Sequence, residues 1–143
     1  MLRFRVSERP SFTAGQFATI GLVVDGELVE RPYSIVSSPH EPFLEFFIEL
    51  VPGGTITPKL WELKLGSAIL VRRRIVGHFS LDTGVTHHLM LATVTGVAPF
   101  VSILRTQQID RERGATSNHQ FVVIHGASQS ADFGTYCSEL EEL

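Results

Sequence analysis

The sequence is poor in three features that would assign it to a special class of proteins. It has a single cysteine, Cys137, so no disulfide can form within the chain, which fits a reducing cytoplasm. No apolar run reaches the roughly 18 residues of a membrane-spanning helix, and no charged-then-apolar leader opens the chain. A net charge of only −3 gives no signature of nucleic-acid or membrane-surface binding. We therefore expect a soluble, cytoplasmic, monomeric protein.

Short segments of β-type composition, separated by turn residues, dominate the first 80 or so residues. Strands are expected at residues 2–6, 16–24, 31–36, 44–50, 68–74 and 77–81. Many short strands with close turns favour an antiparallel barrel or sandwich. One short helix is expected among them, with Thr57 as its N-cap, Pro58 as its first residue and 59–63 as its body.

After Thr86 the pattern changes. Residues 88–93 and 120–125 are continuous apolar runs, typical of strands buried on both faces of a parallel sheet, and helices are expected at 99–113 and 136–143. Strand, helix, strand, helix is the start of a parallel α/β (Rossmann-like) domain. We place the domains at 1–84 and 85–143. Both ends of the sequence read as cut, so the second domain is expected to be incomplete.

The segment Arg31-Pro32-Tyr33-Ser34 carries a cation, an aromatic ring and a hydroxyl on one predicted strand. Because side chains alternate along a strand, Arg31 and Tyr33 should share one face and Ser34 should take the other. A guanidinium pairs with phosphate oxygens, a phenol ring covers a flat ring, and a hydroxyl bonds a ring nitrogen. The segment therefore suits a planar, phosphate-bearing ligand, although arginine and tyrosine also commonly decorate solvated strands.

A glycine-rich loop, VPGGTITP at residues 51–58, leads into the predicted short helix. Free N–H groups and the positive end of the helix dipole bind anions there, and the Thr57 hydroxyl can add a donor. The alternative is an ordinary glycine turn with Thr57 as N-cap, the commoner arrangement for a single loop of this kind.

Two turns of small residues follow the two predicted α/β strands, TVTGVAPF at 93–100 and HGAS at 125–128. In open α/β sheets, ligands bind at the carboxyl ends of the strands, where small residues let a dinucleotide approach the backbone. Every strand–turn–helix unit needs such a turn, so either turn alone indicates little. Both turns should lie at one edge of the sheet.

The order of four motifs along the chain resembles that of the ferredoxin–NADP reductase family, particularly its bacterial ferredoxin/flavodoxin branch. The motifs are Arg-Pro-Tyr-Ser, Gly-Gly-Thr-Ile-Thr, Thr-Gly-Val-Ala-Pro-Phe and His-Gly-Ala. AGQF at 14–17 and IVGHFSL at 75–81 add to the resemblance, which covers essentially the whole chain. It implies an antiparallel FAD-binding β-barrel followed by the first part of an NADP-binding α/β domain.

The resemblance also implies roles for individual residues. Arg31 would pair with the FAD pyrophosphate, Tyr33 would stack on the isoalloxazine and Ser34 would lie near the flavin N5, so Tyr33 and Ser34 are the candidate catalytic residues. Ile48 would line the cofactor site, and Thr95 would bridge the flavin and nicotinamide regions. The pyrophosphate would be held from the loop by residues 55–57. The further implied cofactor-binding residues are Pro32, Thr55, Ile56, Thr57, Gly96, Ala127 and Ser128.

Two positions depart from the family pattern. Val94 stands where members usually have glycine, and a β-branched residue resists positive φ and adds bulk where the nicotinamide half would approach. Ser128 stands where an arginine usually meets the dinucleotide phosphates. A hydroxyl in place of a bidentate cation should weaken phosphate binding and blur the preference for NADP over NAD.

The resemblance thus predicts a flavoprotein oxidoreductase that moves a hydride between NADP(H) and FAD and exchanges single electrons with ferredoxin or flavodoxin. The alternatives are a truncated, non-catalytic FAD-binding module and the reductase component of an oxygenase system.

The run Arg72-Arg73-Arg74 would either dock an acidic partner or line the wet face of a strand. Trp61 and the phenylalanines at 43, 46 and 47 are expected in the core. His87 and His88 lack a spaced partner, so no metal site is expected.

Overall fold

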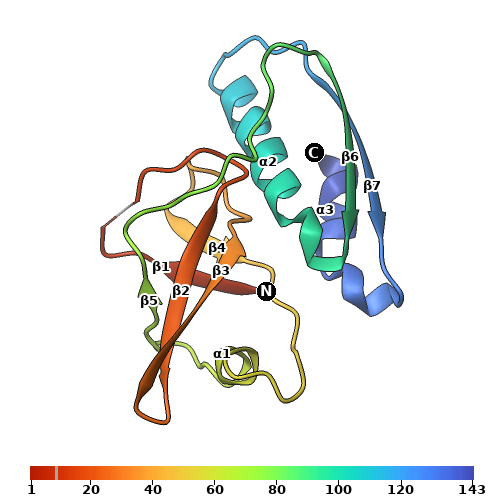
Figure 1. Ribbon diagram of the computed structural model, residues 1–143. Coiled ribbons are helices and arrows are strands. Elements are labelled where there is room, and N and C mark those ends of the chain that lie inside the picture. Colours follow the sequence, from red (N-terminus) through yellow and green to blue (C-terminus); the bar gives the residue numbers. More distant parts are fainter. Residues whose placement is uncertain (9) are drawn as a thin grey trace.

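Strand pairing in the computed structural model, which describes residues 1–8 and 10–143, is antiparallel in the first part of the chain and parallel in the second (Figure 1). The elements of the antiparallel part are β1 (Leu2–Arg5), β2 (Phe17–Val24), β3 (Glu27–Ser34), β4 (Phe43–Phe46), α1 (Thr57–Trp61) and β5 (Leu70–Val71). β1 pairs with β4, and a three-stranded sheet has the order β3-β2-β5.

A tight hairpin joins β2 to β3. Its two central residues, Asp25 and Gly26, have φ values of 51° and 86°, the positive values that the favoured two-residue hairpin turns require. β3 lies at the edge of its sheet, where Pro32 is tolerated even though it has no N–H to donate. The hairpin therefore delivers residues 31–34 as an edge strand in a fixed register with β2.

The core of the antiparallel part lies between its two small sheets and α1. Alternating β2 residues, residues of β4 and one face of α1 form a single buried cluster. Its buried members are Ala18, Ile20, Ile35, Leu44, Phe46, Ile48, Ile56 and Leu60. Burying these apolar side chains is the main favourable term for this part of the fold.

The second part contains β6 (His87–Thr93), η1 (Val94–Val97), α2 (Ala98–Glu112), β7 (Gln120–Gly126), η2 (Ser130–Phe133) and α3 (Tyr136–Glu142). β6 and β7 pair in parallel, and α2 and α3 lie on the same side of the pair (Figure 1). The strands were expected to be buried on both faces, and this expectation is wrong within the described residues. The face away from the helices is open, with Leu89, Leu91, Val122 and Ile124 between 55% and 64% exposed.

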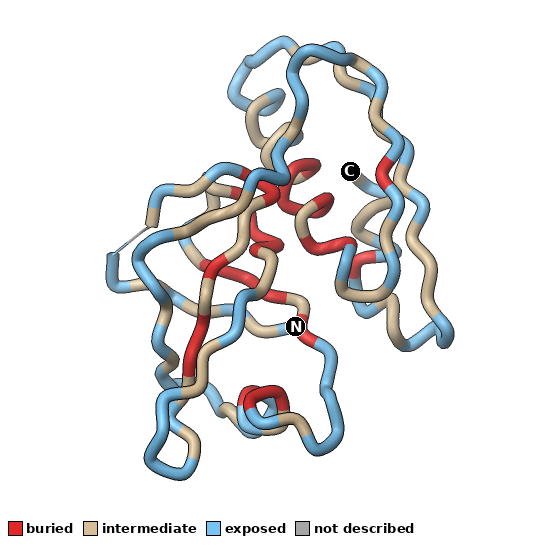
Figure 2. The backbone as a smooth tube through the Cα atoms, viewed as in Figure 1, coloured by how far each residue is buried: buried red, intermediate tan, exposed pale blue. Residues whose placement is uncertain are grey.

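The two parts meet along a seam formed by residues 35–38 and the first half of α2, where Figure 2 shows buried backbone on both sides. The Ser102 hydroxyl donates to the Ser37 carbonyl at 2.7 Å, and the Thr106 hydroxyl donates to the Ser38 hydroxyl oxygen at 2.8 Å. Val36 belongs to a buried cluster with Val97, Ala98, Val101 and Tyr136. The segment directly after β3 is thus fastened to the α/β part.

Several strand boundaries differ from those predicted. The strand expected at 44–50 ends at Phe46, the one expected at 68–74 is only Leu70–Val71, and that expected at 31–36 runs from Glu27 to Ser34. Residues 77–81 form no strand, and Gly77 has a φ of 127°, outside the strand region. Composition predicts which residues can adopt an extended backbone. A strand forms only where a neighbouring strand is also available for backbone hydrogen bonds.

Trp61 was expected in the core and is instead 56% exposed. The helix α1 is five residues long and buries Leu60, and the next side chain of a helix points about 100° away from it. Phe46 is fully buried as expected, while Phe43 and Phe47 are half-buried. Among the described residues, no helix has the length and apolar character that crossing a membrane requires.

Candidate functional site

The residues 31–34 lie on β3 as an edge strand, and the register fixes their faces. Arg31 is opposite Ile20 and Tyr33 is opposite Ala18, two residues of the buried core, so both side chains are on the core-facing side. Ser34 is opposite Phe17, on the other face. The expected division of faces is therefore present in the structure.

The Arg31 guanidinium is exposed and, among the residues that the structure describes, has no carboxylate partner. Its hydrogen bond goes to the carbonyl of its neighbour Glu30, at 2.7 Å, and within residues 1–8 and 10–143 no acidic group forms an ion pair with it. A guanidinium in this state keeps most of its donors for an anionic ligand.

Tyr33 is half-buried and packs against the core cluster that contains Ile48 and Ile56. Burial raises the pKa of the Tyr33 phenol above its ordinary value of 10, and the positive charge of Arg31 acts in the opposite direction. Arg31 and Tyr33 are two residues apart on the same face of β3. At neutral pH the pair presents a cation beside an uncharged aromatic ring.

Ile48 lies beyond the end of β4 and is only 3% exposed. The structure thus packs Tyr33 against the buried cluster to which Ile48 and Ile56 belong. The role of Ile48 in lining a cofactor site stays a prediction.

Hydrogen bonds between residues of the glycine loop and the start of α1 hold the loop in place. The Thr57 hydroxyl accepts the Val51 N–H at 3.0 Å and donates to the Val51 carbonyl at 3.3 Å. Ile56 is the N-cap, so the predicted capping role of Thr57 is wrong: Thr57 is already helical, and its hydroxyl is committed to Val51. A Cβ on Gly54 would lie 3.0 Å from the Val51 carbonyl oxygen, so a larger residue would crowd the tight turn. The exposed hydroxyl of the loop is that of Thr55.

β6 and β7 end at the same edge of their sheet, with Thr93 opposite Gly126. The turns that follow them, residues 94–97 and 127–128, form what we call the rim. The structure therefore brings Thr95 and Gly96 to the same edge as Ala127 and Ser128, as the sequence predicted. The rim also lies close in space to the end of β3. Val36, two residues after Ser34, packs in one cluster with Val97, the residue after Gly96.

Val94 has a φ of 44°. The sequence reasoning that this position needs positive φ agrees with the structure, and valine adopts it here in place of glycine.

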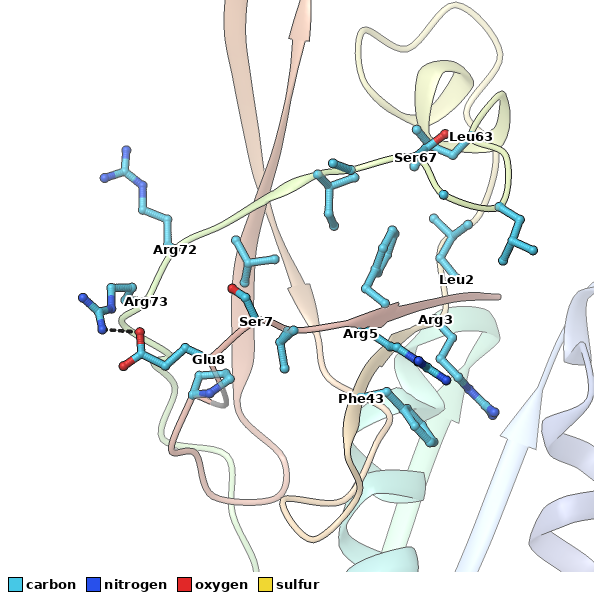
Figure 3. A pocket seen from close by; sticks show the side chains of 18 of the residues that line it. Leu2, Arg3, Arg5, Ser7, Glu8, Phe43, Leu63, Ser67, Arg72 and Arg73 are labelled. Atoms are coloured by element: carbon cyan, nitrogen blue, oxygen red, sulfur yellow. Dashed lines mark hydrogen bonds and ion pairs between the residues drawn. The ribbon is translucent and has the colours of Figure 1, made fainter.

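A large hollow of about 1350 Å³ lies away from residues 31–34, beside β1 and the segment that follows α1 (Figure 3). The basic run borders it, but two of its members are paired. Arg72 donates to both Glu30 carboxylate oxygens, at 2.8 and 2.6 Å, and this contact lowers the pKa of Glu30. Arg73 pairs with Glu8. The run is therefore not a set of three uncommitted cations.

A buried ionic network centred on Glu45 was missed by the sequence reasoning. The side chain of Glu45 on β4 is fully buried. Arg3 on β1 donates to its Oε2 through Nε and Nη2, at 2.8 and 2.6 Å. Arg105 on α2 and the Tyr136 hydroxyl on α3 each donate to its Oε1 at 3.0 Å. The available signal was a lone glutamate inside the apolar run FLEFF, since a buried carboxylate needs cationic and hydrogen-bonding partners.

The network joins the two parts of the molecule. Arg105 also donates to Glu139 of α3 at 2.5 and 2.9 Å, so one guanidinium connects β4 to both helices. Burial alone would lower the pKa of Arg105, but Glu139, Glu45 and Glu41 together raise it above its ordinary value. Burial, followed by the charge of Glu45 and its hydrogen bond, strongly raises the pKa of Tyr136. Arg105 therefore stays charged and Tyr136 neutral at ordinary pH.

The raised tyrosine pKa values predict how stability depends on pH. In the unfolded chain a tyrosine loses its proton near pH 10, whereas Tyr33 and Tyr136 in the folded chain hold theirs to higher pH. Above about pH 10 the unfolded state binds fewer protons, so the free energy of unfolding should fall as the pH rises. Urea denaturation between about pH 8 and 11 measures this slope. Tyr136→Phe should flatten it, and an unchanged slope in that variant would contradict the assignment.

Known proteins with similar sequences and structures indicate the family of this chain. Residues 1–80 match the family described as oxidoreductase FAD-binding domain. The flavodoxin/ferredoxin–NADP reductase of Escherichia coli (strain K12) is 41% identical over 136 residues, covering 92% of this chain and 52% of that protein. The ferredoxin–NADP reductase of Pseudomonas aeruginosa is 41% identical over 110 residues, covering 73% and 42%.

Among solved structures, a ferredoxin NADP+ reductase from Neisseria gonorrhoeae, with bound FAD and NADP, is 25% identical with a TM-score of 0.78. The alignment covers 99% of this chain and 56% of that structure. The chain spans about half the length of the curated relatives it matches. The fold class, an antiparallel barrel followed by the first part of a parallel α/β domain, is confirmed. Since the matched domain takes up more than half of the sequence, including all of β1–β5, the chain belongs to the oxidoreductase FAD-binding domain family.

Proposed function

We propose that this chain is the FAD-binding part, with the beginning of the nucleotide-binding part, of a ferredoxin/flavodoxin–NADP(+) reductase. Residues 1–84 form the flavin unit, and 85–143 start the NADP(H) unit. The observation that carries the proposal is the uncommitted Arg31 guanidinium beside the neutral, half-buried ring of Tyr33. A cation and an aromatic face at one strand edge fit a ligand that combines a pyrophosphate with a flat ring system. The names of the relatives support the same assignment.

FAD, when bound, accepts a hydride and passes electrons on singly. The protein residues bind and orient it. Arg31 would hold the pyrophosphate together with the loop around Thr55, whose hydroxyl is exposed. Tyr33, which packs against the cluster that contains Ile48 and Ile56, would stack on the flavin ring. Ser34 would offer its hydroxyl to the flavin N5, and Pro32 has no N–H at the strand edge to compete with it.

The rim would take the nicotinamide dinucleotide. Thr95 and Gly96 follow β6, and Ala127 and Ser128 follow β7, so all four lie at the carboxyl edge where α/β sheets bind nucleotides. Ser128 offers a hydroxyl in place of a cation, which predicts weak discrimination between NADPH and NADH by this part of the site. Electrons would leave the flavin to ferredoxin or flavodoxin. The single cysteine fits a reducing cytoplasm, and we propose that the protein is a monomer.

The proposal is tested by loading the purified chain with FAD and mixing it anaerobically with NADPH or NADH in a stopped-flow spectrometer. We expect a yellow protein whose flavin absorbance bleaches with either nucleotide. Bound flavin that neither nucleotide reduces would favour the alternative, a non-catalytic FAD-binding module. A chain that binds no FAD would contradict both.

The aromatic ring of Tyr33, and not its hydroxyl, should matter for FAD binding. Tyr33→Phe keeps the ring and should bind FAD within about twofold of the wild type. Tyr33→Ala removes a stacking contact worth about 1 kcal/mol and some buried area, so affinity should fall about tenfold. Titration of flavin fluorescence measures both. Equal losses in the two variants would mean that the hydroxyl is the important group.

A further inference from the structure

The turn at the start of the rim contains a strained residue. Val94 has a φ of 44°, a conformation that a β-branched side chain strongly disfavours. Such a conformation persists only where the surrounding structure holds it. In this turn no glycine occupies the position to relieve the strain, so another group has to fix the Val94 peptide.

His125 makes a side-chain hydrogen bond to this peptide. Its Nε2 lies 2.8 Å from the Val94 carbonyl oxygen. His125 is opposite Ala92 in the parallel register, and Val94 is two residues beyond Ala92, so the ring reaches from β7 across to the end of β6. Because a carbonyl oxygen can only accept, Nε2 must carry the hydrogen.

The surroundings of the ring favour the same tautomer. Nδ1 of His125 is buried and has no hydrogen-bond partner among the described residues. A bare nitrogen there costs less than a buried N–H without an acceptor. The edge of Phe133 packs against the imidazole, with ring centroids 4.9 Å apart and an interplanar angle of 84°. The ring is thereby held with its donor on Val94.

We propose that His125 is a positioning residue for the nucleotide site: its hydrogen bond holds the strained Val94 peptide and thereby fixes how Thr95 and Gly96 are presented at the rim. Val97, at the end of the same turn, is fully buried in the seam cluster, so the turn is anchored at both ends. Between these anchors Gly96 is exposed and Thr95 half-exposed. The inference rests on the proposed function in one respect, that the rim binds the nicotinamide dinucleotide.

The test uses the FAD-loaded chain and four variants. His125→Phe keeps an aromatic ring but removes the donor. His125→Gln places an amide N–H at a similar reach from the backbone. Val94→Gly removes the strain, and the double variant Val94→Gly/His125→Phe measures coupling between them. Two properties are compared: the KM for NADPH and the kcat of NADPH oxidation with ferricyanide as the one-electron acceptor that reoxidises the flavin, and amide hydrogen exchange of residues 94–97.

In His125→Phe the KM for NADPH should rise about tenfold while kcat stays within about twofold, because one hydrogen bond that positions the turn is lost. Exchange at residues 94–97 should become about tenfold faster. In His125→Gln both the KM for NADPH and the exchange rate at residues 94–97 should lie close to those of the wild type. In the Val94→Gly background, His125→Phe should change either quantity by about twofold or less, since glycine needs no support at this φ.

Equal effects of His125→Phe in the wild-type and Val94→Gly backgrounds would overturn the proposal, as would unchanged exchange at residues 94–97. A purely structural histidine would instead alter exchange throughout β7 and would lower kcat and raise KM together. If the wild-type chain is not reduced by NADPH, the proposed function fails, yet the exchange measurements still decide whether His125 holds the turn.

Discussion

Glu45→Gln is expected to lower the free energy of unfolding by about 3 kcal/mol, because the largely buried Arg105 and the half-exposed Arg3 lose the charge that compensates them. Arg3, Arg105 and Tyr136 all donate to this one carboxylate. The loss should lie at the lower end of the range for broken buried pairs. Arg105 keeps Glu139, and the Arg3 side chain is 51% exposed and can be hydrated. Urea denaturation measures the change.

A matched control for this variant is Glu62→Gln. Glu62 also pairs with a cation, Lys59 at 3.1 Å, but both side chains are at least half exposed, so the change should stay within about 0.5 kcal/mol. Glu45→Gln combined with Arg105→Met should be clearly non-additive, since the two residues share one hydrogen-bonded network. If Glu45→Gln proved as mild as Glu62→Gln, the network would not join the two parts of the molecule as described.

Arg31→Ala should weaken FAD binding by about 10- to 100-fold, the effect of losing charge-assisted hydrogen bonds to a phosphate. Its stability should change by less than about 0.5 kcal/mol, because the side chain is exposed and, within the described part of the chain, bonds only a neighbouring carbonyl. Arg31→Lys keeps the charge but not the planar fork, so it should recover only part of the affinity. Fluorescence titration with FAD and urea denaturation measure the two properties separately.

Arg74→Ala is the control for a general loss of positive charge, since Arg74 is exposed and lies outside the candidate site. It should bind FAD like the wild type. Equal weakening in Arg74→Ala and Arg31→Ala would show that net charge, and not the position of the guanidinium, governs binding. A large loss of stability in Arg31→Ala would show that the arginine supports the fold instead of the ligand.

The division into an antiparallel part and an α/β part could be predicted because it depends on local patterns. Short runs with close turns, the Asp25-Gly26 hairpin and the continuous apolar runs at β6 and β7 are all visible in the sequence. The faces of Arg31, Tyr33 and Ser34 follow from strand alternation alone. Strand lengths could not be obtained in this way, because they depend on which neighbour is available for pairing.

The contacts that the sequence did not reveal are those between distant residues. Arg105 and Glu45 are 60 positions apart, and no local pattern connects groups at that separation. The sequence left open whether Arg72 docks a partner or lines the wet face of a strand, and the fold places Glu30 beside it. The Thr57 hydroxyl was assigned to the helix start, but the turn at Gly54 brings Val51 within its reach. In each case several hydrogen-bond or ion-pair partners are possible from the sequence, and the folded chain determines which of them is within reach.

The open face of the β6–β7 pair affects how the chain behaves at high concentration. Its four large apolar side chains form a stripe that every copy of the chain carries, and such stripes promote self-association and precipitation. The tendency should grow with concentration and with salts that strengthen apolar contacts, such as sulfate. Dilute, low-sulfate buffers therefore suit this chain best, and light scattering of the sample is the appropriate check before any titration.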